Sequence, residues 1–382
     1  MAKVKIQTEE NVYLAAVRRN LPRLLSLYNT DSTSRYYGVG DRQYWGWKTI
    51  DFANATFQGA CHGLARLYKH DALPDFLSKE RCLELIDAQI MAVKTVMRAD
   101  GSLEEAFPYE GSFCVTALVA YDVLAALELL NGVLTEEKKQ SCLEIVSPLI
   151  GYVKIAEETH GFISNHLATS VAALFLWDRL YGDSVAVKRG QEILDRILAQ
   201  HSDEGWFSEY GGADPGYQTW ATVYLAEIYR LAPSDRLKET LDKSLAFLRY
   251  FAHPDGSFGG IYGHRQTGLY LPGGIEAFAR ENDDAAALAK FMRGSIAEYR
   301  TVTLDAIDTP NLIPYFNAYC MAATSCVPLQ PQSKLPAEDS DNPFIVKFDR
   351  AGLVVANHKN HYTIISTLKG GAFYSYDRSA NA

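Results

Sequence analysis

The sequence lacks the features that mark a membrane or secreted protein. No stretch approaches ~20 uninterrupted apolar residues, so no membrane-spanning helix is expected. The start, MAKVKIQTEENVYLAAVRRN, has no apolar segment of the kind a signal peptide carries. We therefore expect a cytoplasmic protein, or a periplasmic one if a leader was removed.

Paired cysteines and excess positive charge are also missing. The six cysteines form no CxxC pair and lie mostly in apolar, helical surroundings, which favours buried free thiols over disulfides or a metal site. The formal net charge of −9 argues against nucleic acid or an anionic membrane as a partner. An anionic substrate stays compatible, because the field inside a cleft can differ in sign from the net charge. No cofactor or metal is expected, and the oligomeric state is left open.

What the sequence does contain is ordinary for a globular protein, apart from its tyrosines. Hydrophobic residues make up 48% and charged residues 22% of the chain, as is ordinary for a globular protein. Its length of 382 residues indicates one large domain and a smaller part. There are 23 tyrosines against 5 tryptophans. Because tyrosine combines an apolar ring with a polar tip, this excess is compatible with a carbohydrate-facing surface.

Helical patterns fill the chain from Glu9 to about Ala323. They come in pairs, and Asp-Gly or Asp-x-Gly turns followed by aromatic residues recur with an imperfect period of about 50 residues. Helix pairs that bury each other's apolar faces predict a mainly α fold, an incomplete (α/α) toroid of helical hairpins over residues 1–325. The helices expected from apolar spacing are 82–97, 115–130, 167–181, 189–201, 217–231 and 236–251, and the recurrent turns are 98–105, 201–209 and 253–260.

The pattern changes after the helical part. Residues 326–343 are rich in Pro, Ser and acidic residues, as a linker is. Residues 344–382 alternate and are rich in β-branched residues, which predicts three or four strands of a short antiparallel β segment. That segment is small for an independent sheet, so we expect it to begin a larger antiparallel β domain.

In a toroid, the loops at one end of the inner helices gather around a central cleft, and the polar residues of those loops are the candidates for chemistry. Asn165 and His166 stand at the start of the helix 167–181. Tyr210 and Tyr217 flank a glycine-rich bend, and Arg265 lies in a glycine-flanked loop. We take these five as candidate catalytic residues. Candidate substrate-binding residues in the same kinds of loop are Trp45, Trp47, Lys48, Asn54, Gln58, Tyr109, Glu110, Glu209 and His264.

These residue types suit the removal of the C5 proton from a uronic acid. That proton is weakly acidic until donors neutralise the adjacent carboxylate and stabilise the developing enolate, which an Asn amide or an Arg can do. A His or a deprotonated Tyr can take the proton, and a Tyr hydroxyl can protonate the departing glycosidic oxygen. No metal is needed. The expected partner is an acidic polysaccharide or oligosaccharide.

The short motifs carry a resemblance. SNHLA at a helix start, with Tyr217 of PGYQ following His166 after 51 residues, resembles the heparinase II/III and alginate-lyase group of polysaccharide lyases. The resemblance implies an α/α toroid joined to a C-terminal antiparallel β domain. It also implies that Asn165 neutralises the uronate carboxylate, that His166 is the base, and that Tyr217 is the acid or a shared base and acid.

The sequence departs from that group in two places. The segment SEYGGADPGYQ replaces the group's EGSPxYH pattern, so Tyr210 competes with Tyr217 for the catalytic role. Members of the group often take a further histidine from the β domain, sometimes with a metal. His358 and His361 are the candidates for it here, without a motif that matches them.

We therefore predict a polysaccharide lyase that cleaves a uronic-acid-containing glycan by β-elimination, and three alternatives stay open. A glycoside hydrolase on the same toroid needs two carboxylates held across the sugar ring. A non-catalytic glycan-binding protein would use the same cleft. Asn165 would then be only an N-cap residue, and the tyrosines would line the cleft without taking part in catalysis. A terpene-type cyclase is disfavoured because no DDxxD or DxDD run occurs. The acids a hydrolase could use are Asp100, Glu110, Glu209 and Asp214.

Overall fold

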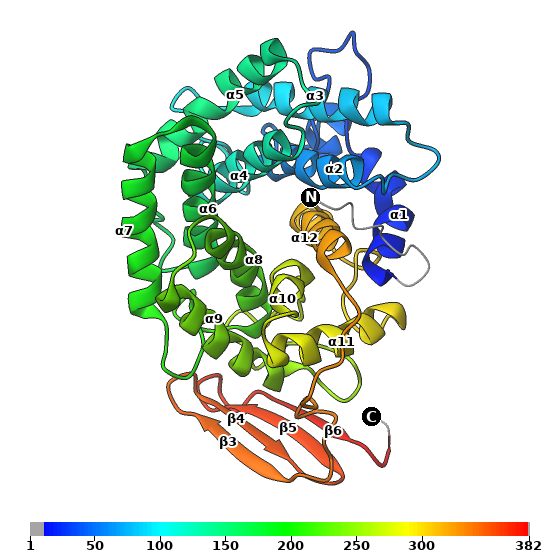
Figure 1. Cartoon of the computed structure of the whole chain (residues 1–382), viewed down its shortest axis with the longest axis vertical. Coiled ribbons are helices and arrows are strands. Elements are labelled where there is room, and N and C mark those ends of the chain that lie inside the picture. Colours follow the sequence, from blue (N-terminus) through cyan, green and yellow to red (C-terminus); the bar gives the residue numbers. More distant parts are fainter. Residues whose placement is uncertain (1–10, 381–382) are drawn as a thin grey trace. The chain divides into compact units, whose positions relative to one another are not determined.

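The structure is a computed structural model, and it describes residues 11–380. The described chain forms two compact units, and Figure 1 labels its helices and the strands near the C-terminus. Within the described residues, unit 1 comprises 11–158, 169–192 and 304–324, and unit 2 comprises 159–168, 193–303 and 325–380. Across the described residues the fold is mainly helical, with a small antiparallel sheet near the C-terminus.

Unit 1 is built from helical hairpins around the apolar helix α4 (Phe113–Leu129), which is buried along almost its whole length. A helix that is apolar on all sides is stable only when neighbours surround it, and α4 contacts both α2 and α5. Short helical turns precede α2 at Gln43–Trp47 and Ala55–Gly59. The other helices of this unit are α1 (Val12–Leu25), α2 (Ala60–Lys69), α3 (Lys79–Val96), α5 (Glu136–Ile155) and α12 (Leu312–Ser325).

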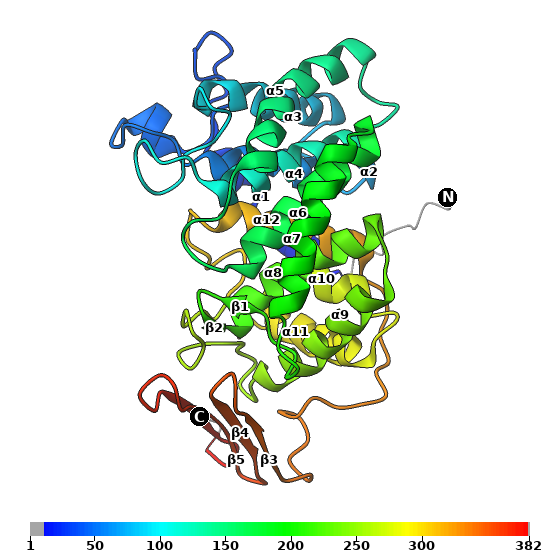
Figure 2. The ribbon, with the colours of Figure 1, turned by 90° about the vertical axis from the view of Figure 1, so that its left-hand side faces the viewer.

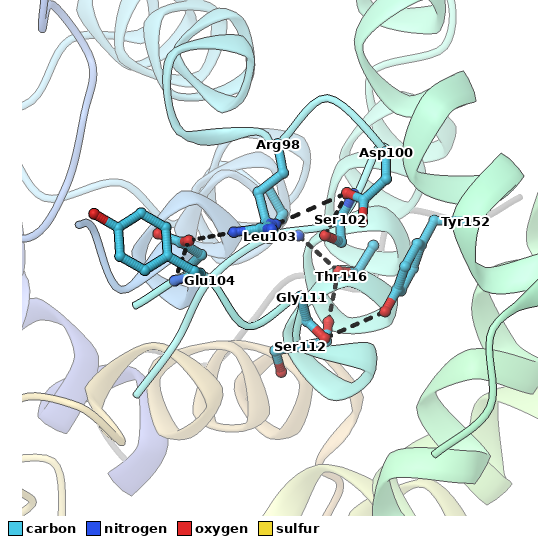
Figure 3. A network of polar contacts seen from close by, with 10 residues as sticks. Arg98, Asp100, Ser102, Leu103, Glu104, Gly111, Ser112, Thr116 and Tyr152 are labelled. Atoms are coloured by element: carbon cyan, nitrogen blue, oxygen red, sulfur yellow. Dashed lines mark hydrogen bonds and ion pairs between the residues drawn. The ribbon is translucent and has the colours of Figure 1, made fainter. Parts of the chain in front are cut away.

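A polar network orders the turn between α3 and α4 (Figure 3). Arg98 donates to Glu104 Oε1 at 2.6 Å, and the same carboxylate oxygen accepts from the backbone N of Tyr109 at 2.8 Å. Deeper in the turn, the backbone N of Leu103 donates to Thr116 Oγ1 at 2.9 Å. The segment that ends at Tyr109 is thus fixed at its base although its tip is exposed.

Unit 2 contains α8 (Pro215–Leu231), α9 (Asp235–Leu248), α10 (Pro272–Phe278) and α11 (Asp283–Ala297). Helices α8 and α10 pack closely, since a Cβ on Gly274 would lie 2.4 Å from the carbonyl oxygen of Thr222. A two-stranded hairpin, β1 (Ser208–Glu209) with β2 (Gly212–Ala213), precedes α8 (Figure 2). Two further helices, α6 (Ser164–Tyr181) and α7 (Ser184–Gln200), have residues in both units.

The C-terminal sheet belongs to unit 2 and has the strand order β3-β4-β5-β6, with every pair antiparallel. Its inner face packs on helical residues of the same unit. Phe348 makes an edge contact with Phe247 at 4.9 Å between ring centroids, and the Tyr362 hydroxyl donates to the carbonyl of Tyr250 at 2.7 Å. The strands are β3 (Phe344–Phe348), β4 (Leu353–Asn357), β5 (His361–Ser366) and β6 (Phe373–Asp377).

The predicted elements are confirmed, with boundaries that shift by a few residues. All six predicted helices form, and the tail forms four strands. One boundary matters: α6 begins at Ser164 rather than 167, so Asn165 lies inside the first turn and is not the N-cap residue. That residues 344–382 begin a larger β domain stays a prediction. Within residues 11–380, no helix is both long and apolar enough to cross a membrane.

Candidate active site

The first turn of α6 is held against the hairpin β1–β2 in unit 2. Ile163 forms a β-bridge with Glu209, and the Ser164 hydroxyl donates to the carbonyl of Ser208 at 2.8 Å. Asn165 then donates twice to one carboxylate: its backbone N lies 3.0 Å from Glu209 Oε1, and its Nδ2 lies 2.7 Å from Oε2. The position and rotamer of the Asn165 amide are therefore fixed by Glu209.

Glu209 is fully buried, and burial raises its pKa well above the usual value for a glutamate. The two hydrogen bonds from Asn165 act in the opposite direction, because they favour the carboxylate, but burial is the larger effect. The sequence predicted that Glu209 binds substrate. Its position under Asn165 makes it the group that orients the amide.

Tyr210 leaves the hairpin at its turn. The turn consists of Tyr210 and Gly211, both with positive φ (+59° and +94°), and it joins paired residues Glu209 and Gly212. A two-residue hairpin turn with positive φ at both positions matches the twist of its strands. This geometry directs the Tyr210 ring toward its neighbours: its hydroxyl lies 3.5 Å from His166 Nε2.

Tyr217 and Arg265 complete the cluster. The Tyr217 ring lies 5.7 Å from the Tyr210 ring, measured between centroids, and stacks on Trp220 at 6.0 Å. The Arg265 guanidinium carbon lies 4.2 Å from the Tyr210 ring centroid, a cation–π contact, and its positive charge also acts on the Tyr217 hydroxyl. All five candidate catalytic residues thus lie together in unit 2, from segments that are far apart in the sequence.

The protonation of Tyr217 follows from its surroundings. Burial raises the pKa of the Tyr217 hydroxyl, and the positive charge of Arg265 opposes this without cancelling it. The phenol therefore stays protonated at neutral pH. It is suited to donate a proton rather than to accept one.

His264 lies beside Arg265 but has a packing role. Its backbone N donates to the carbonyl of Ala213 at 2.9 Å, and a Cβ on Gly212 would lie 2.4 Å from its ring Nδ1. The imidazole thus covers the backbone of β2. This contact joins the loop that carries Arg265 to the hairpin that carries Tyr210.

Seven of the predicted substrate-binding residues lie in unit 1, in two segments. In the first, Trp45 donates from Nε1 to the Leu27 carbonyl at 2.8 Å, whereas Trp47 is 65% exposed. Lys48 follows with φ +54°. Asn54 caps the turn Ala55–Gly59, and the buried Gln58 bonds three backbone groups, those of Gly38, Gly40 and Gln89.

The second unit 1 segment contains Tyr109 and Glu110. Tyr109 is 85% exposed and has φ +66°, while Glu110 is half-buried. Of the seven, Trp47 and Tyr109 therefore have the large rings that are most exposed to solvent. The Gln58 amide, in contrast, is bonded to the backbone.

Two of the acids that a hydrolase could use, Asp100 and Asp214, accept hydrogen bonds from other groups of the protein. Asp100 accepts from the hydroxyl and the backbone N of Ser102 (Figure 3), and the hydroxyl bond lowers its pKa. Asp214 is fully buried and caps α8 by accepting from the backbone N of Tyr217 at 3.1 Å. A lowered pKa and a buried, fully bonded carboxylate both fit structural roles.

No three His, Cys, Asp or Glu side chains within residues 11–380 are grouped closely enough to hold a metal ion. His358 and His361, the candidates from the β segment, are exposed at the turn between β4 and β5.

Two positions around Tyr217 that organise the cluster belong to no motif in the sequence. Trp220 provides the ring on which Tyr217 stacks, and Thr267 donates its hydroxyl to Asp214. Asp214 was considered only as a hydrolase acid. The Asp-Pro step at the start of α8 is a standard N-cap signal and could have identified it.

No protein-family model and no characterised protein matches the sequence. Solved structures do match it. Chondroitin AC lyase from Streptomyces coelicolor A3 has a TM-score of 0.61 at 10% identity and covers 100% of this chain. Xanthan lyase from Paenibacillus has a TM-score of 0.60 at 11% identity and covers 98%. Cellobiose 2-epimerase from Bacillus thermoamylovorans has a TM-score of 0.56 at 11% identity and covers 82% of this chain and 99% of its own.

Heparinase III also matches, with a TM-score of 0.54 at 14% identity over 99% of this chain. A family 76 glycoside hydrolase matches with a TM-score of 0.54 at 8% identity over 82% of this chain. This chain spans 56%, 38% and 58% of the chondroitin AC lyase, xanthan lyase and heparinase III chains. The matches confirm the predicted fold, an (α/α) toroid of helical hairpins followed by a short antiparallel sheet, and with it the resemblance to polysaccharide lyases at the level of fold.

Proposed function

We propose that this protein acts on glycans as a polysaccharide lyase, cleaving a uronate-containing chain by β-elimination. The observation that carries the proposal is the cluster in unit 2, in which an amide, an imidazole, two phenols and a guanidinium lie together. The fold it shares with chondroitin AC lyase, xanthan lyase and heparinase III supports a glycan substrate. Fold alone does not determine chemistry, so the proposal depends on the cluster.

The first role is neutralisation of the substrate carboxylate. Asn165 Nδ2 has two hydrogens, and the bond to Glu209 orients the group. Arg265 is an exposed residue and adds a permanent positive charge. A carboxylate bound by these donors withdraws electrons from C5, and the same donors stabilise the enolate that forms when the proton leaves.

The second role is proton transfer. His166 is the base that takes the C5 proton, and the Tyr210 hydroxyl beside its Nε2 orients the ring. The electron pair of the C5–H bond forms a C4–C5 double bond as the bond from C4 to the glycosidic oxygen breaks. Tyr217, which burial keeps protonated, donates its proton to that oxygen.

Two other activities occur on this fold and yield different products. A hydrolase adds water across the glycosidic bond and needs carboxylates that reach the sugar. Asp100 already accepts from Ser102, and the buried Asp214 accepts from Tyr217 and from Arg265. A sugar epimerase, like a lyase, moves a carbon-bound proton, but it leaves the glycosidic bond intact.

Product analysis distinguishes lyase, hydrolase and epimerase activity. We expect incubation with glucuronate-, iduronate-, mannuronate- and guluronate-containing polymers to give ultraviolet absorbance from an unsaturated uronate, with no solvent oxygen in the products when heavy-oxygen water is used. A saturated product that carries solvent oxygen would establish hydrolysis. Deuterium uptake from heavy water into an uncleaved sugar would establish epimerisation, and either result would overturn the proposal.

A further inference from the structure

The carboxylate of Asp214 connects two parts of the candidate active site. Asp214 Oδ1 accepts from the backbone N of Tyr217 at 3.1 Å, at the first turn of α8, and from the hydroxyl of Thr267. Its Oδ2 accepts from the backbone N of Arg265 at 2.7 Å. One buried side chain thus fixes both the helix start that carries Tyr217 and the loop that carries Arg265.

Close packing makes this connection tight. We call residues 259–270 the arginine loop. A Cβ on Gly263 would lie 2.7 Å from Asp214 Oδ2, and a Cβ on Gly216 would lie 2.3 Å from the Thr267 hydroxyl oxygen. Gly259 has φ +65° and no room for a side chain either, because a Cβ there would lie 2.5 Å from the Thr267 carbonyl oxygen. The loop can approach the start of α8 only because these three positions lack side chains.

The chemistry of the three donors requires a carboxylate at position 214. The groups that point at it are two backbone N–H groups and a hydroxyl, so acceptors are needed on both oxygens. An asparagine would turn an NH₂ group toward at least one of these donors. Because the side chain is 0% exposed, water cannot replace a lost bond, and an unsatisfied buried donor is costly.

We infer that Asp214 is a positioning residue that couples the proton donor Tyr217 to the carboxylate-binding Arg265, so that the two approach one sugar ring from fixed directions. The inference rests on the proposed function for what the two residues do, and on the hydrogen bonds alone for how they are held. Asp214 contacts neither the substrate nor the reacting atoms. It acts through the two residues it holds, and displacing either by about 1 Å is enough to lower the rate ~100-fold.

Thr267 allows the coupling to be weakened without touching the capping carboxylate. Thr267→Val removes the hydroxyl that bonds Asp214, and Thr267→Ser keeps it. Thr222→Val is the control, because Thr222, like Thr267, has a hydroxyl that makes one bond, to the Gln218 carbonyl at 2.7 Å on α8, and Thr222 is the more buried of the two. Asp214→Asn tests the carboxylate itself. If Asp214→Asn does not fold, Thr267→Val alone still tests whether Asp214 couples the two segments.

The first readout needs no activity. Arg265 is exposed in the arginine loop, so trypsin cleavage after Arg265, followed by mass spectrometry of the two fragments, reports how firmly the loop is held. We expect Thr267→Val and Asp214→Asn to speed this cleavage about tenfold or more over the wild type, with Thr267→Ser and Thr222→Val unchanged. Equal cleavage in the wild type and Thr267→Val would overturn the coupling, whatever the protein catalyses.

The second readout uses the uronan on which the wild type acts. We expect Thr267→Val to raise KM, through Arg265, and to lower kcat, through Tyr217, by about tenfold each. The shape of the pH–rate profile should stay as in the wild type, since Asp214 exchanges no proton with substrate. Loss of one limb of the profile in Asp214→Asn would make Asp214 an acid or base and overturn the positioning role. A wild type without lyase activity whose loop is nevertheless loosened by Thr267→Val would defeat the proposed function and leave the coupling standing.

Discussion

Asn165 and Glu209 form a two-point contact in which the backbone N and the side-chain Nδ2 of one residue donate to the two carboxylate oxygens of the other, at 3.0 and 2.7 Å. Both residues are buried. The contact ties the start of α6 to the β1–β2 hairpin and leaves the Asn165 amide a single orientation. A group that must neutralise a charge in a transition state has to be held in this way before the substrate arrives.

The first prediction tests this contact with Glu209→Gln. The new amide presents an NH₂ group to one of the two Asn165 donors, so the Asn165 side chain loses its fixed orientation. We expect kcat to fall ~100-fold and the free energy of unfolding to fall by about 1–3 kcal/mol. Glu227→Gln is the control, since Glu227 is also buried but pairs with Arg230 on α8. Turnover at the wild-type rate in a folded Glu209→Gln protein would contradict the role of Asn165.

The second prediction concerns the alkaline limb of the pH–rate profile. As the acid, Tyr217 works only while protonated, and burial raises its pKa above the ordinary tyrosine value. The limb should therefore lie above about pH 10. Because the Arg265 charge favours the phenolate, Arg265→Gln should move the limb to still higher pH, whereas Arg280→Gln, in an exposed turn after α10, should not. A limb that moves to lower pH in Arg265→Gln, or that persists in Tyr217→Phe, would exclude Tyr217 as the acid.

The third prediction contrasts a buried hydrogen-bonded chain with an exposed ion pair. In unit 1, His62 Nδ1 lies 2.9 Å from Asp122 Oδ1, Arg66 donates to His62 Nε2 at 3.0 Å, and both His62 and Asp122 are buried. Asp122→Ala removes the acceptor for the buried His62 Nδ1 and should lower the free energy of unfolding by about 1–3 kcal/mol. In unit 2, Asp195→Ala removes an exposed partner of Arg236 and should cost less than about 1 kcal/mol. Chemical denaturation of both variants measures the loss of unfolding free energy. Equal losses would show that the buried hydrogen bonds stabilise the protein no more than the exposed ion pair does.

The fourth prediction concerns a buried histidine that packs on the C-terminal sheet. His253 Nε2 lies 2.7 Å from the Tyr262 hydroxyl, and its ring stacks on Tyr374 of β6 at 3.9 Å. The Ser257 hydroxyl donates to Asp255 at 2.6 Å, so His253 Nδ1, at 2.7 Å from that hydroxyl, is the donor to Ser257. The imidazole is thus neutral, and burial lowers its pKa to about 4.

The lower pKa of His253 in the folded chain makes the free energy of unfolding depend on pH. The unfolded chain takes up this proton near pH 6.5 and the folded chain only near 4, so the stabilisation is fully present above pH 6.5 and is lost as the pH falls toward 4. Between pH 7 and 5 this residue should account for about 2 kcal/mol of lost unfolding free energy. His253→Gln should remove that share of the slope, and His358→Gln, at an exposed site, should not. Identical slopes in the wild type and His253→Gln would refute the assignment.

Local chemistry in the sequence predicted much of the fold. Helix α4 is apolar on every side and could only be a buried centre, and the alternation after residue 343 could only form strands. The Asn165, His166 and Tyr217 cluster was also predictable, because helix starts and glycine-marked bends are where a toroid exposes polar groups. The start of α6 was misplaced, since the Ser164 bond to Ser208 that extends the helix comes from a distant segment.

What the sequence could not show was the partner of each polar group. Glu209 was predicted to bind substrate, yet it is buried and bonded to Asn165, because the β1–β2 hairpin packs on the first turn of α6. Gln58 looked available for a ligand, and long-range backbone groups engage its amide. Each of these outcomes depends on contacts between segments that no local pattern encodes.

The most direct test of the account is to compare turnover of one uronan by the wild type, His166→Ala and Tyr217→Phe, with circular dichroism to verify that all three are folded. If the imidazole takes the carbon-bound proton and the phenol protonates the leaving oxygen, each variant should form the unsaturated product at least ~100-fold more slowly than the wild type. Folded variants that both form it at the wild-type rate would show that this cluster is not where the bond is broken.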